Sequence, residues 1–155
     1  MYPPLFRHFT HRGLLMYVTA WLTLSATTAS VLANAASLPS VHESQGVSYV
    51  TGGIDLDESN AIKAAMPSYP LVVEVYHQTA DHKNEYTSSA TLTLATPQGA
   101  QIFQATLEGP FALVQAKPGH YEVTVALNGQ VQHKRIDVKA KGSTRATFVF
   151  QGGPN

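Results

Sequence analysis

The chain has 155 residues, with ten Lys and Arg balancing ten Asp and Glu, and it contains no cysteine. The lack of cysteine excludes disulfide bonds, thiol nucleophiles and lipid-modified cysteines, so the fold must depend on apolar burial and strand pairing. The balanced charge, without a basic stripe, argues against nucleic acid as a partner.

Residues 1–35 have the pattern of a secretory signal peptide. Arg7 and Arg12 precede a long uncharged run, and small residues follow at positions 33–35. We predict cleavage before Ala36 and a periplasmic or secreted mature chain of 120 residues with a formal charge of −2. A retained anchor is the alternative, because the uncharged run is about long enough to span a bilayer. Only in that case do we expect the chain to contact a membrane.

The remaining chain is long enough for one domain with one core. Residues 36–49 contain Ser, Pro and Gly and few large apolar residues, and we predict a flexible leader there. The folded domain is expected over residues 50–150 and a short tail over residues 151–155.

The densest acidic cluster lies near the start of this domain. Asp55 and Asp57 occupy positions one and three of a possible calcium loop. Such a loop needs glycine at position six and a bidentate glutamate at position twelve, where Asn60 and Met66 stand instead. The cluster therefore favours the start of a helix over a metal site.

We predict a helix over residues 56–66. Asp55 and Glu58 have the spacing of a capping box, and both carboxylates suit the positive end of the helix dipole. Ile62 and Met66 lie four residues apart and so share one face, which we expect to pack on the rest of the domain.

From Leu71 onward the apolar pattern has a period of two, interrupted by turn residues at short intervals. Seven segments are predicted as strands: 71–77, 91–95, 101–107, 111–116, 121–127, 131–138 and 144–150. The core is expected to contain Tyr121, Val123, Val125, Leu127, Phe148 and Phe150. The predicted fold is mainly β, a seven-stranded antiparallel β-sandwich with one short N-terminal helix.

The turn at residues 128–129 leaves two registers to compare. A two-residue loop pairs Val125 with Gln132, which sets an apolar side chain opposite a polar one. A three-residue loop pairs Val125 with Val131, and we favour this register. A β-bulge is then expected near residues 134–135.

The segment from Gly109 to Phe150 resembles the carboxypeptidase regulatory-like domain, a prealbumin-like (transthyretin-like) β-sandwich. The resemblance depends on Phe111, on the Pro-Gly-x-Tyr motif at residues 118–121, and on the turn at Gly129. The upstream half is similar to single-domain exported proteobacterial proteins. The resemblance implies a sandwich that accompanies other domains, and it assigns no catalytic residue, because the zinc ligands of metallocarboxypeptidases lie in a separate domain.

The polar loop after the first predicted strand contains the best candidate metal ligands, His77, Asp81, His82 and Glu85. Imidazole and carboxylate groups suit zinc or copper, provided that three or four of them converge. The alternative is a solvated loop without a cofactor.

A second candidate is a cationic patch formed by His120, His133, Lys134 and Arg135, which could bind an anionic ligand. The alternative is that these charges keep a sheet edge soluble.

The sequence contains no nucleophile motif such as Gly-x-Ser-x-Gly. We therefore expect an exported, non-enzymatic β-sandwich that acts as a binding or accessory module in the bacterial cell envelope. Its partner is expected to be a protein or an envelope component, added through an exposed strand edge. A small periplasmic metal- or ligand-binding protein that uses the His77–Glu85 loop is the alternative.

Overall fold

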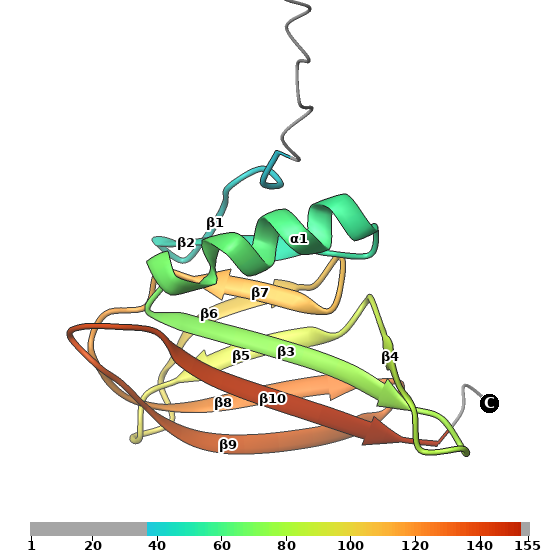
Figure 1. Ribbon diagram of the computed structural model, residues 1–155. Coiled ribbons are helices and arrows are strands. Elements are labelled where there is room, and N and C mark those ends of the chain that lie inside the picture. Colours follow the sequence, from blue (N-terminus) through green and yellow to red (C-terminus); the bar gives the residue numbers. More distant parts are fainter. Residues whose placement is uncertain (1–36, 153–155) are drawn as a thin grey trace, which may run out of the picture. The chain divides into compact units, whose positions relative to one another are not determined.

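The computed structural model describes residues 37–152, which form two β-sheets packed face to face, with one helix on the outside (Figure 1). The predicted signal segment lies outside the described residues. The strands are β1 (His42–Ser44), β2 (Val47–Gly52), β3 (Leu71–Gln78), β4 (Asn84–Tyr86), β5 (Thr91–Ala95), β6 (Gln101–Thr106), β7 (Phe111–Val114), β8 (Gly119–Leu127), β9 (Gln130–Val138) and β10 (Thr144–Gln151). Sheet A has the order β1-β2-β7-β3-β10, with β4 also paired to β3, and sheet B has the order β6-β5-β8-β9.

The two-sheet, mainly β architecture agrees with the predicted sandwich. Each of the seven predicted segments overlaps a strand, but the described chain has ten strands. Two of the additional strands, β1 and β2, begin where a flexible leader was predicted. Val47 and Tyr49 of β2 pack against the core although the surrounding sequence is polar. The folded domain therefore begins earlier than the sequence pattern indicated.

One strand pair differs from the predicted antiparallel arrangement. β10 pairs with β3 in parallel over eight residues, from Thr144 opposite Leu71 to Gln151 opposite Gln78. Strands joined by a tight hairpin must be antiparallel, whereas strands without such a connection are free to be parallel. β10 follows β9, which lies in the other sheet, so no hairpin fixes its direction against β3.

The apolar side chains form two clusters, one on each side of sheet A. The larger cluster lies between the sheets and includes Phe103, Val123, Val125, Phe148 and Phe150, all fully or almost fully buried. Tyr121 is half-buried at its margin, so the predicted core residues take the expected positions. The second cluster lies under the helix and consists of Val50, Ile62, Met66, Val72, Phe111 and Leu113.

Helix α1 (Leu56–Ala65) covers part of the outer face of sheet A and is followed by the 3-10 turn η1 (Met66–Ser68). Ile62 and Met66 are buried in the second cluster, as predicted. The predicted capping box is absent at this terminus, because Asp55 caps the helix without a side-chain hydrogen bond. The Glu58 carboxylate lies against Gly52 instead. No helix within residues 37–152 has the length and apolar character needed to cross a membrane.

The β8–β9 hairpin has the register that the apolar pattern disfavoured. Val125 lies opposite Gln132, and residues 128–129 form a two-residue loop in which both have positive φ. The pairing runs without a shift from residue 130 to residue 138, so the predicted bulge near residues 134–135 is wrong. The only register shift in sheet B is between Leu94 and Ala95, in the described part of the chain.

The polar residues opposite the apolar face of β8 have a specific role. Gln132 donates from Nε2 to the carbonyl of Val149 at 2.8 Å, and Gln130 donates in the same way to Gln151 at 2.8 Å. Lys134 donates to the carbonyl of Thr147, and its Nζ lies 5.1 Å from the centroid of the Phe148 ring. We call these three side chains, Gln130, Gln132 and Lys134, the seal.

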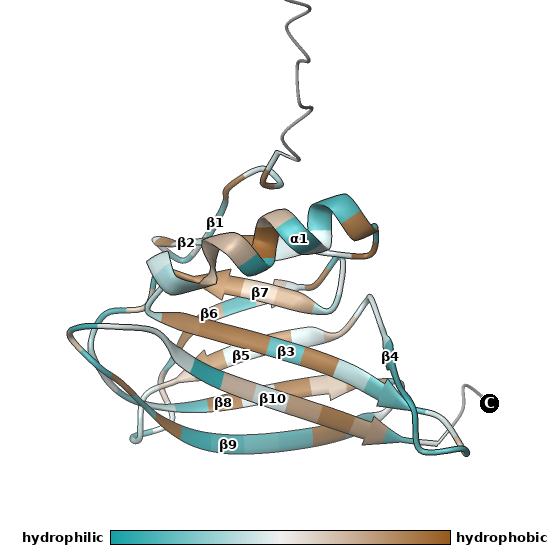
Figure 2. Ribbon diagram, in the orientation of Figure 1, coloured by the Kyte–Doolittle hydropathy of each residue, from teal (hydrophilic) through white to brown (hydrophobic). Residues whose placement is uncertain are grey.

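The seal accounts for the polar residues on the inner face of β9, a strand that is hydrophilic along most of its length (Figure 2). Its three side chains, at alternate positions of β9, bind carbonyls at alternate positions of β10, so they take the place of a backbone ladder between the two sheets. On the opposite side of the sandwich, the Ser44 hydroxyl donates to the carbonyl of Gln104 of β6 at 2.6 Å. Inward-pointing polar and charged side chains are a known protection of sheet edges against pairing with other chains.

Replacing Gln130, Gln132 and Lys134 together by alanine is expected to cause concentration-dependent association, because β10 then exposes unpaired carbonyls beside an uncharged Ala-Thr-Phe-Val-Phe-Gln segment. Sedimentation velocity should show at least a doubling of the mass relative to the parent chain. The matched control replaces Val131, His133 and Arg135, from the other face of β9, and should sediment as the parent does. Equal behaviour of the two triple variants would show that the seal does not protect the edge.

Candidate functional site

The four predicted metal ligands lie on β3, β4 and the turn between them, and each has its own surroundings. His77 is opposite Glu85 in the β3–β4 pairing, and its Nε2 contacts the carbonyl oxygen of Gly152. Asp81 accepts a hydrogen bond from the Thr79 hydroxyl at 2.5 Å and pairs with Lys83 at 2.9 Å. These two contacts, the Thr79 hydroxyl first, lower the pKa of the Asp81 carboxyl.

The structure does not bring these residues together as a ligand set. Across residues 37–152, no three His, Cys, Asp or Glu side chains lie in a group that could hold a metal ion. His82 occupies a turn position with φ of 62°, which makes it part of the turn geometry. The zinc or copper hypothesis therefore has no geometric support within this part of the chain.

The predicted cationic patch is divided between two surfaces. In the β8–β9 pairing, His120 is opposite Asp137, Glu122 is opposite Arg135, and Thr124 is opposite His133. These alternate positions share the outer face of sheet B. Lys134 has the opposite orientation and belongs to the seal.

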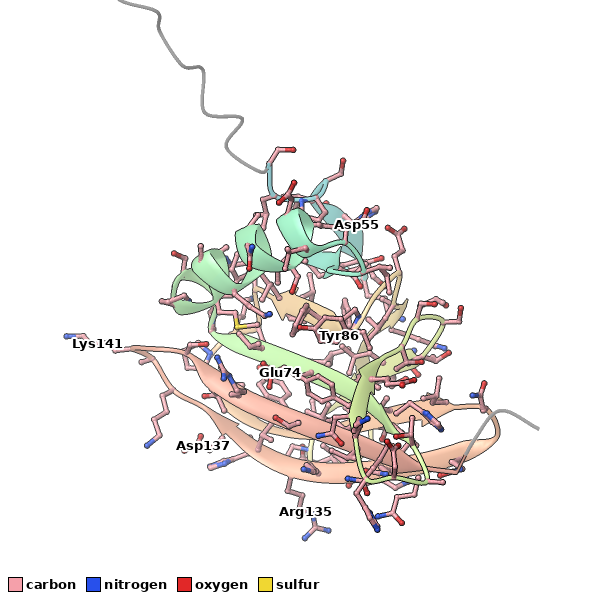
Figure 3. All side chains as sticks on the ribbon, turned by 45° about the vertical axis from the view of Figure 1, so that its right-hand side comes forward. Asp55, Glu74, Tyr86, Arg135, Asp137 and Lys141 are labelled. Atoms are coloured by element: carbon pink, nitrogen blue, oxygen red, sulfur yellow. The ribbon has the colours of Figure 1, made fainter. Side chains whose placement is uncertain are left out.

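His120 and Arg135 line a surface cavity of about 550 Å³, which we call the arginine cavity. Its lining residues are Pro97, His120, Tyr121, Glu122, Arg135, Ile136 and Asp137. This volume is within the usual range of ligand pockets. Figure 3 shows Arg135 and Asp137 on the side of the molecule away from α1.

The acidic and basic side chains in and beside the arginine cavity lie in histidine–carboxylate pairs, with the exception of Arg135. His120 Nδ1 lies 3.5 Å from Asp137 Oδ1, and His133 Nδ1 lies 3.5 Å from Glu122 Oε1. His133 Nδ1 is also 2.8 Å from the Thr124 hydroxyl. No carboxylate among residues 37–152 is within ion-pair distance of the Arg135 guanidinium. Arg135 therefore presents its donors to the solvent.

A second polar group, not expected from the sequence, lies between α1 and β4. Lys63 Nζ donates to the Tyr86 hydroxyl at 2.9 Å, and the Ser59 hydroxyl is 3.4 Å from the same oxygen. The Tyr86 ring stacks on Tyr76, with centroids 5.9 Å apart, and meets the edge of Phe111 at 5.5 Å. We call Ser59, Lys63 and Tyr86 the Tyr86 cluster.

A serine, a lysine and a tyrosine in contact could suggest a nucleophile with its base. Ser59 is only 1% exposed, however, so a substrate cannot reach its hydroxyl. Lys63 Nζ also lies 5.6 Å from the centroid of the Tyr86 ring and 5.7 Å from that of Phe111. The Tyr86 cluster therefore holds α1 against β4 through hydrogen bonds and cation–π contacts.

A buried carboxylate lies beside this cluster, also below α1 (Figure 3). Glu74 accepts a hydrogen bond from the Thr147 hydroxyl at 3.0 Å and pairs with Arg145 at 3.8 Å. Arg145 also donates to the Met66 sulfur at 3.2 Å. Glu74 is thus satisfied within the sheet by two residues of β10, and Arg145 extends this link to η1.

The pKa values of the two stacked tyrosines, Tyr76 and Tyr86, are shifted in opposite directions. The Lys63 hydrogen bond, followed by that of Ser59, lowers the pKa of Tyr86. Burial, followed by the charge of Glu74, raises the pKa of Tyr76. Because Tyr86 ionises more readily in the folded chain, it adds stability only at alkaline pH, and that contribution is lost as the pH falls through its folded-state pKa. Tyr76 has the opposite effect, since its stabilising contribution is lost as the pH rises through its folded-state pKa.

Replacing Lys63 by methionine is expected to raise the pKa of Tyr86 toward the ordinary tyrosine value, because the main cause of its lowering is removed. An absorbance titration of the phenolate, with Tyr86→Phe subtracted, should show this change directly. Lys83→Met is the matched control, since Lys83 pairs with Asp81 and not with Tyr86. An unchanged Tyr86 titration, or an equal change in the control, would contradict the assignment.

Sequence reasoning identified His120 and Arg135 because basic residues recur along one hairpin. It missed Tyr86, and only the Ser59–Lys63 spacing of one helical turn gave any signal. Tyr86 reaches α1 because β4 pairs with β3, and a three-residue strand with no buried residue leaves no periodic pattern. In comparisons with known proteins, no family model matches this chain, and no curated protein gives a significant match.

Proposed function

We propose that this chain is an exported, non-enzymatic binding module of the bacterial cell envelope that recognises a protein partner through the arginine cavity. The observation that carries the proposal is the unpaired Arg135 guanidinium, which lies in a cavity whose two carboxylates are already next to histidines. Arginine is enriched among the residues that dominate binding energy at protein interfaces.

The lining of the cavity favours a partner that presents both signs of charge. A partner carboxylate would pair with Arg135 in bidentate geometry, and a partner donor would bind Glu122 or Asp137. A purely anionic ligand would meet these two carboxylates as well. Complementary patterns of this kind give specificity more than affinity.

The surface around the cavity suits a protein interface. Val131, on the same face of β9, is 54% exposed and lies opposite Ala126, and the next pair along this face is Thr124 and His133. The strand edges are less suitable for adding a partner strand, because the seal occupies β10 carbonyls and Ser44 occupies the carbonyl of Gln104. The face of sheet B therefore replaces a strand edge as the proposed contact.

Two features of the sequence support the wider proposal. The pattern of residues 1–35 favours export, and the resemblance over Gly109–Phe150 is to a sandwich that accompanies other proteins' domains. The chain offers no comparable support for a metal-binding function, since no ligand set converges within residues 37–152.

Arg135→Ala tests the proposal in a crosslinked pull-down from the bacterial envelope. Loss of a central arginine should reduce recovery of the partner by about tenfold or more. Lys141→Ala is the matched control, because it removes an exposed positive charge from the β9–β10 connection, and recovery should stay within about twofold of the parent. Equal recovery by both variants, or no reproducible partner after crosslinking, would refute the proposal.

A further inference from the structure

A second cavity lies at the end of the sandwich where three connections meet. It has a volume of about 340 Å³ and is lined from both sheets. The β1–β2 turn and the segment after β7 contribute from sheet A, while β5, β6 and β8 contribute from sheet B. We call it the end cavity. It shares only Tyr121 with the arginine cavity.

The inner wall of the end cavity is apolar. Leu94 and Ala116 are buried, and Val47, Ile102 and Tyr121 are half-buried and pack against the main core. The Tyr121 hydroxyl donates to the carbonyl of Lys117 at 2.8 Å, so its polar atom already has a partner. A ligand therefore meets a wall of aliphatic groups and one aromatic ring.

The remaining lining residues are polar and include a single charged group. They are Gln45, Gly46, Thr96, Gln115 and Lys117, with no carboxylate among them. Lys117 forms no ion pair with a carboxylate of the described chain. An unpaired ammonium group next to an apolar wall attracts an anionic group attached to an apolar body.

We infer that the end cavity binds a small apolar molecule that carries one anionic group, with the apolar body on Val47, Ile102 and Tyr121 and the anion at Lys117. The volume is at the lower end of the range for small-molecule sites, so the ligand is small. The inference goes beyond the proposed protein partner and does not depend on it, because Arg135 does not line this cavity.

Fluorescence titration with anilinonaphthalene sulfonate tests this inference, because the probe combines an aromatic body with one anionic group. The folded parent chain should bind one probe molecule, and octanoate should displace it while octanol at the same concentration should not. Lys117→Ala should weaken probe binding by about tenfold, which is the loss expected for one charge-assisted contact. Lys139→Ala, which removes an exposed charge from the β9–β10 connection, should change it by less than about twofold.

Val47→Phe supplies a second variant that fills the cavity from its half-buried margin and should also weaken binding. Thermal unfolding checks that each variant is folded, since loosely folded chains bind the probe without a defined site. Non-saturating binding, an unchanged affinity for Lys117→Ala, or an equal loss for Lys139→Ala would overturn the inference. Arg135→Ala should leave the titration unchanged, so failure here is separate from failure of the protein-binding proposal.

Discussion

Phe111→Ala is expected to lower the free energy of unfolding by about 3–5 kcal/mol, the usual cost of removing a buried phenylalanine. Phe111 is fully buried and lies at the centre of the cluster under α1, next to Ile62. It also meets the edge of the Tyr86 ring, and Lys63 lies over its face. The substitution therefore removes the surface on which α1 is held.

Phe111→Ala should also destabilise helix α1 locally, in addition to lowering the global free energy of unfolding. A ten-residue helix is marginal on its own, so α1 depends on its docking. Amide hydrogen exchange of residues 59–65 should accelerate in Phe111→Ala more than exchange in β8. Phe148→Ala, in the cluster between the sheets, should cost a similar free energy in urea unfolding without this selective loss of protection in α1. Undiminished protection of α1 in Phe111→Ala would contradict the role given to the second cluster.

Gly109→Ala is expected to destabilise the chain by about 3 kcal/mol, the upper end of the usual cost of overpacking. A Cβ atom at this position would lie 2.2 Å from the carbonyl oxygen of Gly52 and 2.3 Å from its carbonyl carbon. Both neighbours are backbone atoms at the end of β2, so no side-chain rotation can relieve the overlap. The β6–β7 connection must move away from β2 to accept the methyl group.

Gly99→Ala separates this steric effect from the conformational preference of glycine. Gly99 has φ of +85°, and a methyl group added there would have no neighbouring atom within 4 Å. Its substitution therefore costs only the left-handed backbone strain of about 1–2 kcal/mol. Gly109 is not among the glycines with positive φ, so its cost is steric. Urea unfolding of both variants should place Gly109→Ala below Gly99→Ala in stability, and the reverse order would show that the β6–β7 connection is not in close contact with the end of β2.

The strongly periodic parts of the sequence predicted the fold well. The seven segments with alternating apolar residues are strands, and the residues expected in the core, such as Val123 and Phe148, are buried. Helix α1 also follows its prediction, because Ile62 and Met66 share one face at helical spacing. When one face of a strand or helix is buried, its apolar residues must recur with the period of that element, so the pattern is visible in the sequence.

The missed features depend on contacts between distant segments. The predicted hairpin register was wrong because it compared Gln132 only with Val125, its partner in β8. The hydrogen-bond acceptor of Gln132 is in β10 instead. Gln130 and Lys134, the other two seal residues, also have their hydrogen-bond acceptors in β10. A polar residue on the inner face of an edge strand can be satisfied by the opposite sheet, and local pairing rules do not include that partner.

For the candidate sites too, the sequence predicted local features and missed those that depend on contacts between distant segments. The basic residues near the last hairpin were recognised, but the sequence could not separate Arg135, which lines the cavity, from Lys134, which points to β10. The end cavity combines residues as distant as Val47 and Tyr121, and no linear pattern connects them.

Photo-crosslinking from defined positions tests the proposed binding surface most directly. A photoreactive residue would replace His120 or His133 on the outer face of sheet B, or Tyr76 or Val149 on sheet A, in chains produced in the bacterial envelope. We expect one discrete crosslinked protein from positions 120 and 133, lost when Arg135→Ala is added, and none from positions 76 and 149. Crosslinking from the sheet A positions alone, or equally from all four, would contradict recognition through the arginine cavity.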